Sequence, residues 1–457
     1  MKGKNNDLGR DSILPLVLRL AIPTMLAQLV SVFYSIVDRM YIGNMAGVGD
    51  LALAGVGVCG PIVTLIASFG TLVGLGGSPI LAMRMGEGRY DQAKQILANC
   101  FLLLLVLSGT LTVLFLLLKD NLLMWFGASE ITFPYADAYL TIYTLGTFFA
   151  LMSTGLNSFL ICQGFSGLGM ATVTLGAVLN IVLDPVFIFA LDMGVSGAAL
   201  ATVLSQMSSF AFVFCTLLGK KVPVRLSLGG YSWRVIARVL SFGLSPFLII
   251  SLDSVLLIIL NTMLQRYGGP GLGDTLVTCA TIVQSYFLLI AMPMGGITLG
   301  TQPVVSFNYG AGRPDRIRTA MKCIVGLCLA FCALMTVLTH TVSPYFVRLF
   351  TQDAEMVDRA VGYIKIFTAM ILPLALQYPI VDELTALGHV RLALFCSLFR
   401  KTLYLLCLFL LPMLVSAQAA FLAEPISDLV AAVNSCCIFL YFFPKILREA
   451  AVGHRVV

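Results

Sequence analysis

The sequence consists of a series of apolar stretches, each longer than about 20 residues, with short polar connections between them. A helix needs about 20 residues to cross the hydrocarbon core of a bilayer, whereas a strand needs about half that number. A helix also satisfies its backbone hydrogen bonds internally, as lipid requires. We therefore predict an all-α polytopic membrane protein with twelve transmembrane helices, near residues 13–37, 51–83, 96–118, 134–162, 168–190, 194–218, 239–264, 275–304, 319–341, 359–386, 391–415 and 422–444.

Composition and charge agree with lipid as the main solvent. Of the 457 residues, 59% are hydrophobic and 11% are charged, which is too apolar for an ordinary water-soluble surface. With both termini in the cytoplasm, 20 of the 28 Lys and Arg residues fall on the cytoplasmic side, which basic residues prefer. Topology therefore explains the net charge of +6, and we expect an inner-membrane protein with no nucleic acid partner.

An internal repeat divides the chain into two similar halves. The segments 86–91 and 310–315 share the pattern Gly-x-Gly-Arg-x-Asp, and the step from position 86 to position 310 defines the repeat offset. The same offset pairs Pro79 with Pro303, Tyr139 with Tyr363 and Gly164 with Gly388, and it pairs Pro23 with Pro246 to within a single position. An even number of spans between the copies predicts two six-helix bundles of the same direction around a central cleft, as in transporters with parallel repeats.

The repeat also predicts the domain boundaries. The N-terminal six-helix lobe is assigned to residues 1–219 and the C-terminal six-helix lobe to residues 239–457. Residues 220–238 are basic and contain Pro223 and a Gly229-Gly230 pair, so we expect them to form a cytoplasmic linker between the lobes.

Carboxylates inside the predicted spans are the main candidates for function, because each costs about 2.5–3.5 kcal/mol at a helix centre on insertion scales. Asn180 and Asp184 are four residues apart and share one helix face, directly before the helix-bending Pro185. This combination predicts a pocket for a proton or a small cation. Asp38 has an alternative interpretation as an ion pair with Arg39. The other acids, Asp253, Asp382 and Glu383, are weaker candidates, because helix ends or interhelical hydrogen bonds account for them.

Three parts of the sequence resemble the multidrug and toxic compound extrusion (MATE) transporters: Pro23, the segment Tyr34–Gly43 and the segment Asn180–Pro185. The resemblance covers the whole chain, including the twelve spans and the two Gly-x-Gly-Arg-x-Asp loops, and is greatest to the bacterial MepA-like branch. It implies an antiporter in which H+ or Na+ enters an acidic pocket in the N-terminal half and drives the release of an organic, often cationic, substrate.

The same resemblance implies site residues. It assigns cation coupling to Asp38, Asn180, Asp184, Tyr34, Asn157 and Thr202, and the first three of these would bind Na+. The repeat places Asn261 opposite Asp38 and Leu408 opposite Asp184, so the second half lacks a copy of the acidic pocket. In some branches of the family, acids on the seventh and tenth helices contribute to coupling or to substrate binding. The predicted substrate-binding residues are Asp253, Gln284, Asp382 and Glu383.

Other functional classes fit the sequence less well. A lipid-linked oligosaccharide flippase of similar architecture is the alternative, but its cleft would need basic residues for a pyrophosphate, and the spans contain mainly acids. A channel would not need paired halves. No enzyme is expected, because the sequence has no nucleophile with a base, phosphate loop or metal-ligand spacing. We expect no cofactor apart from the coupling ion, small organic cations and membrane lipid as partners, and a monomeric protein.

Overall fold

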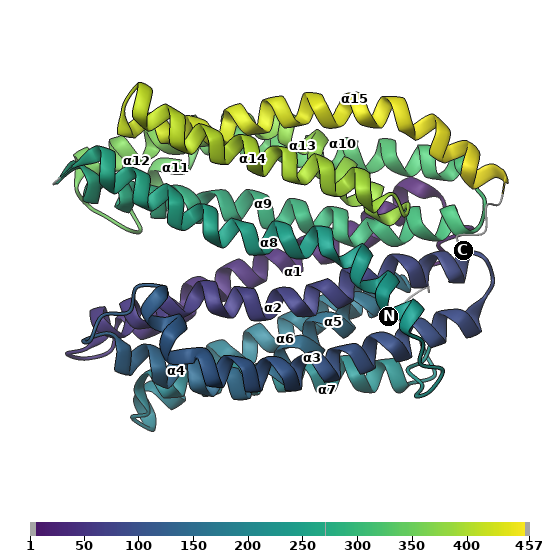
Figure 1. Ribbon diagram of the computed structural model, residues 1–457, viewed down its shortest axis with the longest axis horizontal. Helices are drawn as coiled ribbons and strands as arrows, with labels where there is room; N and C mark the ends of the chain where they lie inside the picture. Colours follow the sequence, from purple (N-terminus) through teal and green to yellow (C-terminus); the bar gives the residue numbers. More distant parts are fainter. Residues whose placement is uncertain (1–5, 270, 453–457) are drawn as a thin grey trace. The chain divides into compact units, whose positions relative to one another are not determined.

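The computed structural model describes residues 6–269 and 271–452, and their regular secondary structure is entirely helical (Figure 1). The first half of the chain forms α1 (Ile13–Gly43), α2 (Gly49–Gly86), α3 (Tyr90–Trp125), α4 (Phe133–Leu145), α5 (Thr147–Cys162), α6 (Ser166–Pro185), the π-helix η1 (Val186–Ala190) and α7 (Gly194–Leu218). The second half forms α8 (Trp233–Gly268), α9 (Leu272–Gly310), α10 (Pro314–Thr341), α11 (Ser343–Val347), α12 (Ala354–Phe367), α13 (Ile371–Ala386), α14 (Val390–Leu414), the 3-10 helix η2 (Ala417–Leu422) and α15 (Ala423–Val452).

Ten segments of the described chain are helices long and apolar enough to cross a membrane. Two further spans are bent pairs, α4 with α5 at 56° and α12 with α13 at 48°. Counting each pair as one span gives twelve, which confirms the predicted all-α class and number of spans. The bends are equivalent in the repeat, because the repeat offset pairs Gly146, before α5, with Met370, before α13.

The turns that follow α2 and α9 have the same backbone geometry, as the repeated motif predicts. Gly88 has a φ of +76° and Gly312 a φ of +66°, in the left-handed region that favours glycine. In each turn the N–H of the following arginine donates to the carbonyl oxygen five residues earlier, at 2.9 Å in both copies. Each glycine therefore ends its helix in the same way, and the repeat is present in the fold as well as in the sequence.

Contacts divide the chain into two compact units. Unit 1 contains the residues up to Arg10 together with Leu26–Ser251, and unit 2 contains Asp11–Met25 together with the residues from Leu252 onward. The helices α1 and α8 are therefore each divided between the units. The beginning of α1 belongs to unit 2, and the beginning of α8 belongs to unit 1. This division differs from the lobes 1–219 and 239–457, which assign each of these helices to one lobe.

Two glycines allow these helix segments to pack closely inside their units. In unit 1, a Cβ added to Gly76 of α2 would lie 2.2 Å from the carbonyl oxygen of Val239 on α8. In unit 2, a Cβ added to Gly300 of α9 would lie 2.1 Å from Oγ1 of Thr24 on α1. The repeat offset pairs the two glycines, so both units use a small residue at the same point for close helix packing.

The predicted linker packs against buried amide side chains within unit 1. Nδ2 of Asn99 donates to the carbonyl oxygen of Gly230 at 3.1 Å, and Oδ1 of Asn99 accepts from the N–H of Ser232 at 2.8 Å. The buried Gln163 accepts from the N–H of Val224 at 2.8 Å. The segment between α7 and α8 is therefore part of the packed structure of unit 1.

Candidate functional site

The last turns of α6 carry a buried polar network in unit 1. Nδ2 of Asn180 donates to Oδ1 of Asp184 at 3.2 Å and to Oγ1 of Thr202, on α7, at 3.3 Å. Thr202 in turn donates to the carbonyl oxygen of Ala198 at 3.0 Å. Asn180 is 2% exposed and Asp184 is fully buried. The sequence spacing of four residues therefore places both side chains on one inward face, as predicted.

The helix changes form directly after this network. Pro185 has no N–H to donate, and the chain continues as the π-helix η1, in which the N–H of Leu191 donates to the carbonyl oxygen of Val186 at 2.9 Å. The proline therefore ends α6 next to Asp184, and the irregular backbone begins where the polar pocket lies.

Asp38 reaches this network from α1. Its carboxyl group interacts directly with that of Asp184, and the hydroxyl of Tyr34, one turn earlier on α1, lies within the field of both. Arg39 is exposed, and no ion pair joins it to Asp38 among the residues that the structure describes. The geometry therefore supports an acid pair from two helices in preference to the salt bridge considered for Asp38.

Several oxygens of this cluster lack a hydrogen-bond donor. Oδ1 of Asp38, Oδ2 of Asp184 and Oδ1 of Asn180 are buried and accept no hydrogen bond from any side chain or backbone group in the described part of the chain. A buried acceptor without a partner costs about 1–3 kcal/mol, and more when it is charged. Carboxylate and amide oxygens are the ligands that hard cations prefer. A bound proton or small cation would therefore satisfy the cluster.

Tyr139, which the repeat pairs with Tyr363, also belongs to this site. Tyr139 on α4 interacts with the hydroxyl of Thr202 and lies within the field of Asp38. Its ring stacks on that of Tyr143 with centroids 6.3 Å apart, and Tyr143 accepts a 3.5 Å hydrogen bond from Nε2 of Gln206. The pairing of Tyr139 with Tyr363 in the repeat was the only sequence signal for it.

Asn157 lies apart from the rest of the predicted pocket. Its Oδ1 is 3.3 Å from the position that a Cβ on Gly169 would occupy. Gly169 is 11 residues before Asn180 on α6, or about 16 Å along the axis at 1.5 Å per residue. The structure thus brings together Tyr34, Asp38, Asn180, Asp184 and Thr202, and it places Asn157 near the other end of the helix.

Two predicted acids of unit 2 lie next to each other on α13. Oγ1 of Thr298 donates to Oδ2 of Asp382 at 2.5 Å, and Oγ1 of Thr301 donates to Oε1 of Glu383 at 3.3 Å. Both threonines are on α9. Oε2 of Glu383 accepts no hydrogen bond within the described ranges. The α9–α13 contact therefore holds a second polar cluster, separate from the one on α6.

The other two predicted substrate-binding residues have different surroundings. Asp253 on α8 forms an ion pair with Lys401 of α14. Gln284 is half-buried on α9, 14 residues before Thr298, which is about 21 Å along the helix. The structure therefore does not bring Gln284 to Asp382, and it gives Asp253 a fixed positive partner.

Unit 2 contains a buried ionic network that was not predicted from the sequence. Nη1 of Arg400 on α14 lies 3.0 Å from Oε1 of Glu424 and 2.8 Å from Oδ1 of Asp428, both on α15. Arg400 is 7% exposed, Glu424 is 7% exposed and Asp428 is fully buried. The signal was present, because a basic residue inside a predicted span and two acids four residues apart in the next predicted span need partners.

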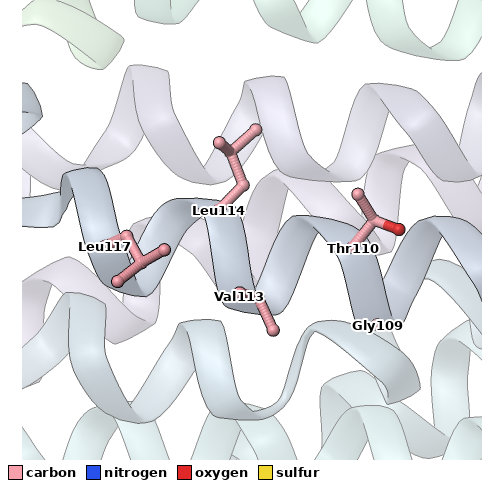
Figure 2. A pocket seen from close by; sticks show the side chains of 5 residues that line it. All are labelled: Gly109, Thr110, Val113, Leu114 and Leu117. Atoms are coloured by element: carbon pink, nitrogen blue, oxygen red, sulfur yellow. The ribbon is translucent and has the colours of Figure 1, made fainter.

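A groove on the outer face of α3 is lined mainly by apolar side chains. Figure 2 shows it between Gly109 and Leu117, and its lining is Gly109, Thr110, Val113, Leu114 and Leu117. The side chains of Val113 and Leu117 are 61% and 76% exposed. Apolar side chains exposed in this way are suited to contact with acyl chains, so the groove is part of the lipid-facing surface.

Comparison with known proteins identifies the family. A family model described as MatE matches the chain twice, at residues 23–186 and 247–411. The first positions of the two matches, 23 and 247, are related by the offset of the internal repeat. The chain belongs to the MATE family. Together with the spans described above, this makes it a multi-pass membrane protein.

Individual MATE relatives match over nearly their whole length. The multidrug export protein MepA of Staphylococcus haemolyticus (strain JCSC1435) is 24% identical over 437 residues, which are 94% of this chain and 93% of the relative. MepA of Staphylococcus aureus (strain MSSA476) is 22% identical over 436 residues, 95% and 94% of the two chains. The likeness to a MepA-type protein thus extends across both units.

Solved MATE structures have the same fold. The outward-facing conformation of a multidrug resistance MATE family transporter of the MOP superfamily superposes with a TM-score of 0.90 at 22% identity, covering 98% of this chain and 100% of that one. A MATE structure in the bent conformation gives a TM-score of 0.87 at 22% identity, covering 99% and 100%. The twelve-span MATE architecture therefore applies to the whole chain.

Proposed function

We propose that this MATE protein is a secondary active exporter that antiports organic, mostly cationic, drugs or toxic compounds against H+ or Na+. The observation that carries the proposal is the pair of half-buried Asp38 on α1 and fully buried Asp184 on α6, whose carboxyl groups interact and retain buried oxygens without donors. The relatives named multidrug export protein support the class of substrate.

The acid pair supplies a physical basis for coupling. Two buried carboxylates in contact repel each other unless one proton or one cation lies between them. A cation bound there attracts both α1 and α6, with Asn180 offering a further oxygen, and its departure leaves two like charges. The two states therefore differ in the free energy of the α1–α6 contact, and a difference of this kind shifts the population of two conformations.

The proposal includes the topology inferred from the basic residues. With both termini in the cytoplasm, α6 runs outward, and Asp184, in its last turn, lies toward the external side. The coupling ion would then enter from outside, down its gradient, while the substrate leaves. We propose that one chain is sufficient for this cycle, because both halves of the fold lie within it.

A lipid-linked oligosaccharide flippase is less well supported. A pyrophosphate head group needs basic side chains that are available to bind it. Arg400 and Lys401 are basic residues buried within α14, and each is already paired with acids of its own unit. These two residues therefore offer no site for an anion.

The test is efflux of a fluorescent organic cation from vesicles that contain the purified protein, under an imposed proton gradient or an imposed sodium gradient. Asp184→Asn removes the charge of the pair, and Asp192→Asn is a matched control on the exposed turn eight residues later. We expect efflux under one gradient, loss of that efflux in Asp184→Asn, and normal efflux in Asp192→Asn. Gradient-driven efflux at the normal rate in a folded Asp184→Asn variant would contradict the proposal.

A further inference from the structure

The ionic network between α14 and α15 is deeply buried in unit 2. One guanidinium nitrogen, Nη1 of Arg400, contacts both Glu424 at 3.0 Å and Asp428 at 2.8 Å. None of the three residues is more than 7% exposed. Arg400 therefore has to balance two carboxylates in surroundings where water contributes little.

The neighbouring lysine does not relieve this imbalance. Lys401 follows Arg400 on α14, but it is paired with Asp253 of α8. The network then contains two cations, Arg400 and Lys401, and three carboxyl groups, with Glu424 and Asp428 sharing one guanidinium. If all three carboxyl groups are ionised, unit 2 holds one negative charge in excess at this place.

One oxygen is left over in the same place. Oδ1 of Asp428 accepts from Arg400, whereas Oδ2 is buried and accepts no hydrogen bond from the residues that the structure describes. The groups whose charge or polarity reaches Asp428 are Cys332 of α10, Tyr378 of α13, Arg400, Lys401 and Tyr404 of α14, and Glu424 of α15. The only cations in that set are Arg400 and Lys401, which already have the partners described.

The two carboxyl groups on α15 differ in their surroundings. Glu424 lies in the first turn of α15, where the helix dipole favours a negative charge. Asp428 lies one turn further in and lacks this advantage. The excess charge is therefore more costly on Asp428 than on Glu424.

From this arrangement we infer that Asp428 binds one exchangeable proton on Oδ2, which makes the α14–α15 contact of unit 2 a proton site separate from the Asp38–Asp184 pair. The proton comes from water and converts the carboxylate to a neutral carboxyl group, so the network becomes electrically neutral. A proton needs no cavity, which suits a fully buried atom better than a larger cation does. The site does not depend on whether the pair in unit 1 drives transport.

The test uses infrared difference spectroscopy of the full chain in lipid nanodiscs as the pH is changed. The background variant is Asp38→Asn with Asp184→Asn, so the acid pair of unit 1 contributes nothing. In that background we expect a carboxylic acid C=O band that disappears when Asp428→Asn is added and persists when Glu424→Gln is added. Asn at position 428 keeps an oxygen for Arg400, and a thermal melt establishes that each variant is folded.

Four outcomes would overturn the inference. Loss of the band in Glu424→Gln alone would assign the proton to Glu424. Identical spectra with and without Asp428→Asn at every pH would remove the site, and loss of the band on addition of Na+ at constant pH would indicate a metal cation in place of a proton. Should Asp428→Asn not fold, Asp428→Glu keeps a carboxyl group that can bind the proton, and the band is expected to shift in frequency; an unshifted band would contradict the assignment.

Discussion

Equivalent helices of the two units carry opposite kinds of polar cluster. In unit 1 the helices α1, α6 and α7 bring together two acids, an amide and two hydroxyl groups, with no cation among them. In unit 2 the corresponding helices α8, α14 and α15 bring together three acids with an arginine and a lysine. The repeat offset pairs Gly176 with Arg400 and Asp184 with Leu408. Unit 2 therefore has a cation where unit 1 has a glycine, and an apolar residue where unit 1 has an acid.

One scaffold thus supports two uses of buried charge. A buried charge without a partner is costly and is retained where it exchanges a cation, whereas a buried ion pair is costly mainly when one member is removed. We therefore expect substitutions in the unit 1 cluster to reduce transport with little effect on the stability of the fold. Substitutions in the unit 2 network should reduce that stability.

The largest effect is expected at Asp38. The change Asp38→Asn removes one of two like charges, so gradient-driven efflux should fall to the level of vesicles without protein, while the unfolding temperature stays equal or rises. Efflux assays and thermal melts of the same preparation measure both. A large loss of stability in this variant would remove the contrast between the units.

The second prediction concerns Arg400. In Arg400→Met the acids Glu424 and Asp428 lose their cation, and breaking a buried network of this kind costs about 3–5 kcal/mol. Adding Asp428→Asn should recover a large part of that loss, because the remaining buried charge is smaller. Denaturant unfolding in detergent measures the change, and the exposed Arg39→Met should alter stability by less than about 0.5 kcal/mol.

A smaller effect is expected from helix packing, which should be similar in both units. In Gly300→Ala the new Cβ would lie 2.1 Å from Oγ1 of Thr24 and 2.7 Å from the carbonyl oxygen of Leu20, so the helices must shift, at a cost of about 1–3 kcal/mol. Gly76→Ala in unit 1 should cost about as much. Gly295→Ala on the same helix α9 is the control, since its Cβ would meet no atom within 4 Å. Equal melting temperatures for all three variants would contradict the packing.

The smallest effect is expected for the pH dependence of stability, through His389, the residue before α14. His389 lies 3.5 Å from Glu449, and burial lowers its pKa from the ordinary 6.5 more than this carboxylate raises it. Because the folded state binds the proton less well than the unfolded state, stability is full above pH 6.5 and falls as the pH drops toward the folded pKa. The equivalent residue of unit 1 is Phe165. The variant His389→Phe should therefore not show the loss of stability at low pH, which we expect to be a few tenths of a kcal/mol, on the order expected for a partly exposed group. Melts at pH 7.5 and pH 5.5 compare the two.

The sequence predicted the features that local pattern decides. Span length, the internal repeat and the shared helix face of Asn180 and Asp184 all follow from spacing along the chain. Which residues of distant helices meet depends on the rotation of each helix about its axis, and the sequence does not state that rotation. For this reason Tyr139 was missed as a neighbour of Thr202, and Asn157 was assigned to a pocket from which it lies apart.

The partners in the ionic network of unit 2 were also not predictable from the sequence, because they lie on different helices. Arg400 and Lys401 lie inside one predicted span and Glu424 and Asp428 inside the next, but the four were not predicted to be partners. The division of α1 and α8 between the units was also not predicted, because the decisive contacts join segments far apart in the sequence, such as those of Thr24 and Gly300. The sequence signal for close packing there was the pair of glycines at equivalent positions, Gly76 and Gly300.

The division of α1 and α8 has a consequence for the origin of the chain. An ancestral protein of half this length, with the same packing, would have completed its bundle with the first turns of a second copy. Such a protein is a dimer with exchanged helices, and each subunit depends on the other for its fold. Duplication and fusion of the gene would have turned this exchange between subunits into one within a single chain. The two halves would then have been free to diverge, one toward an acid pair and the other toward an ionic network, while the exchanged helix segments still completed each unit.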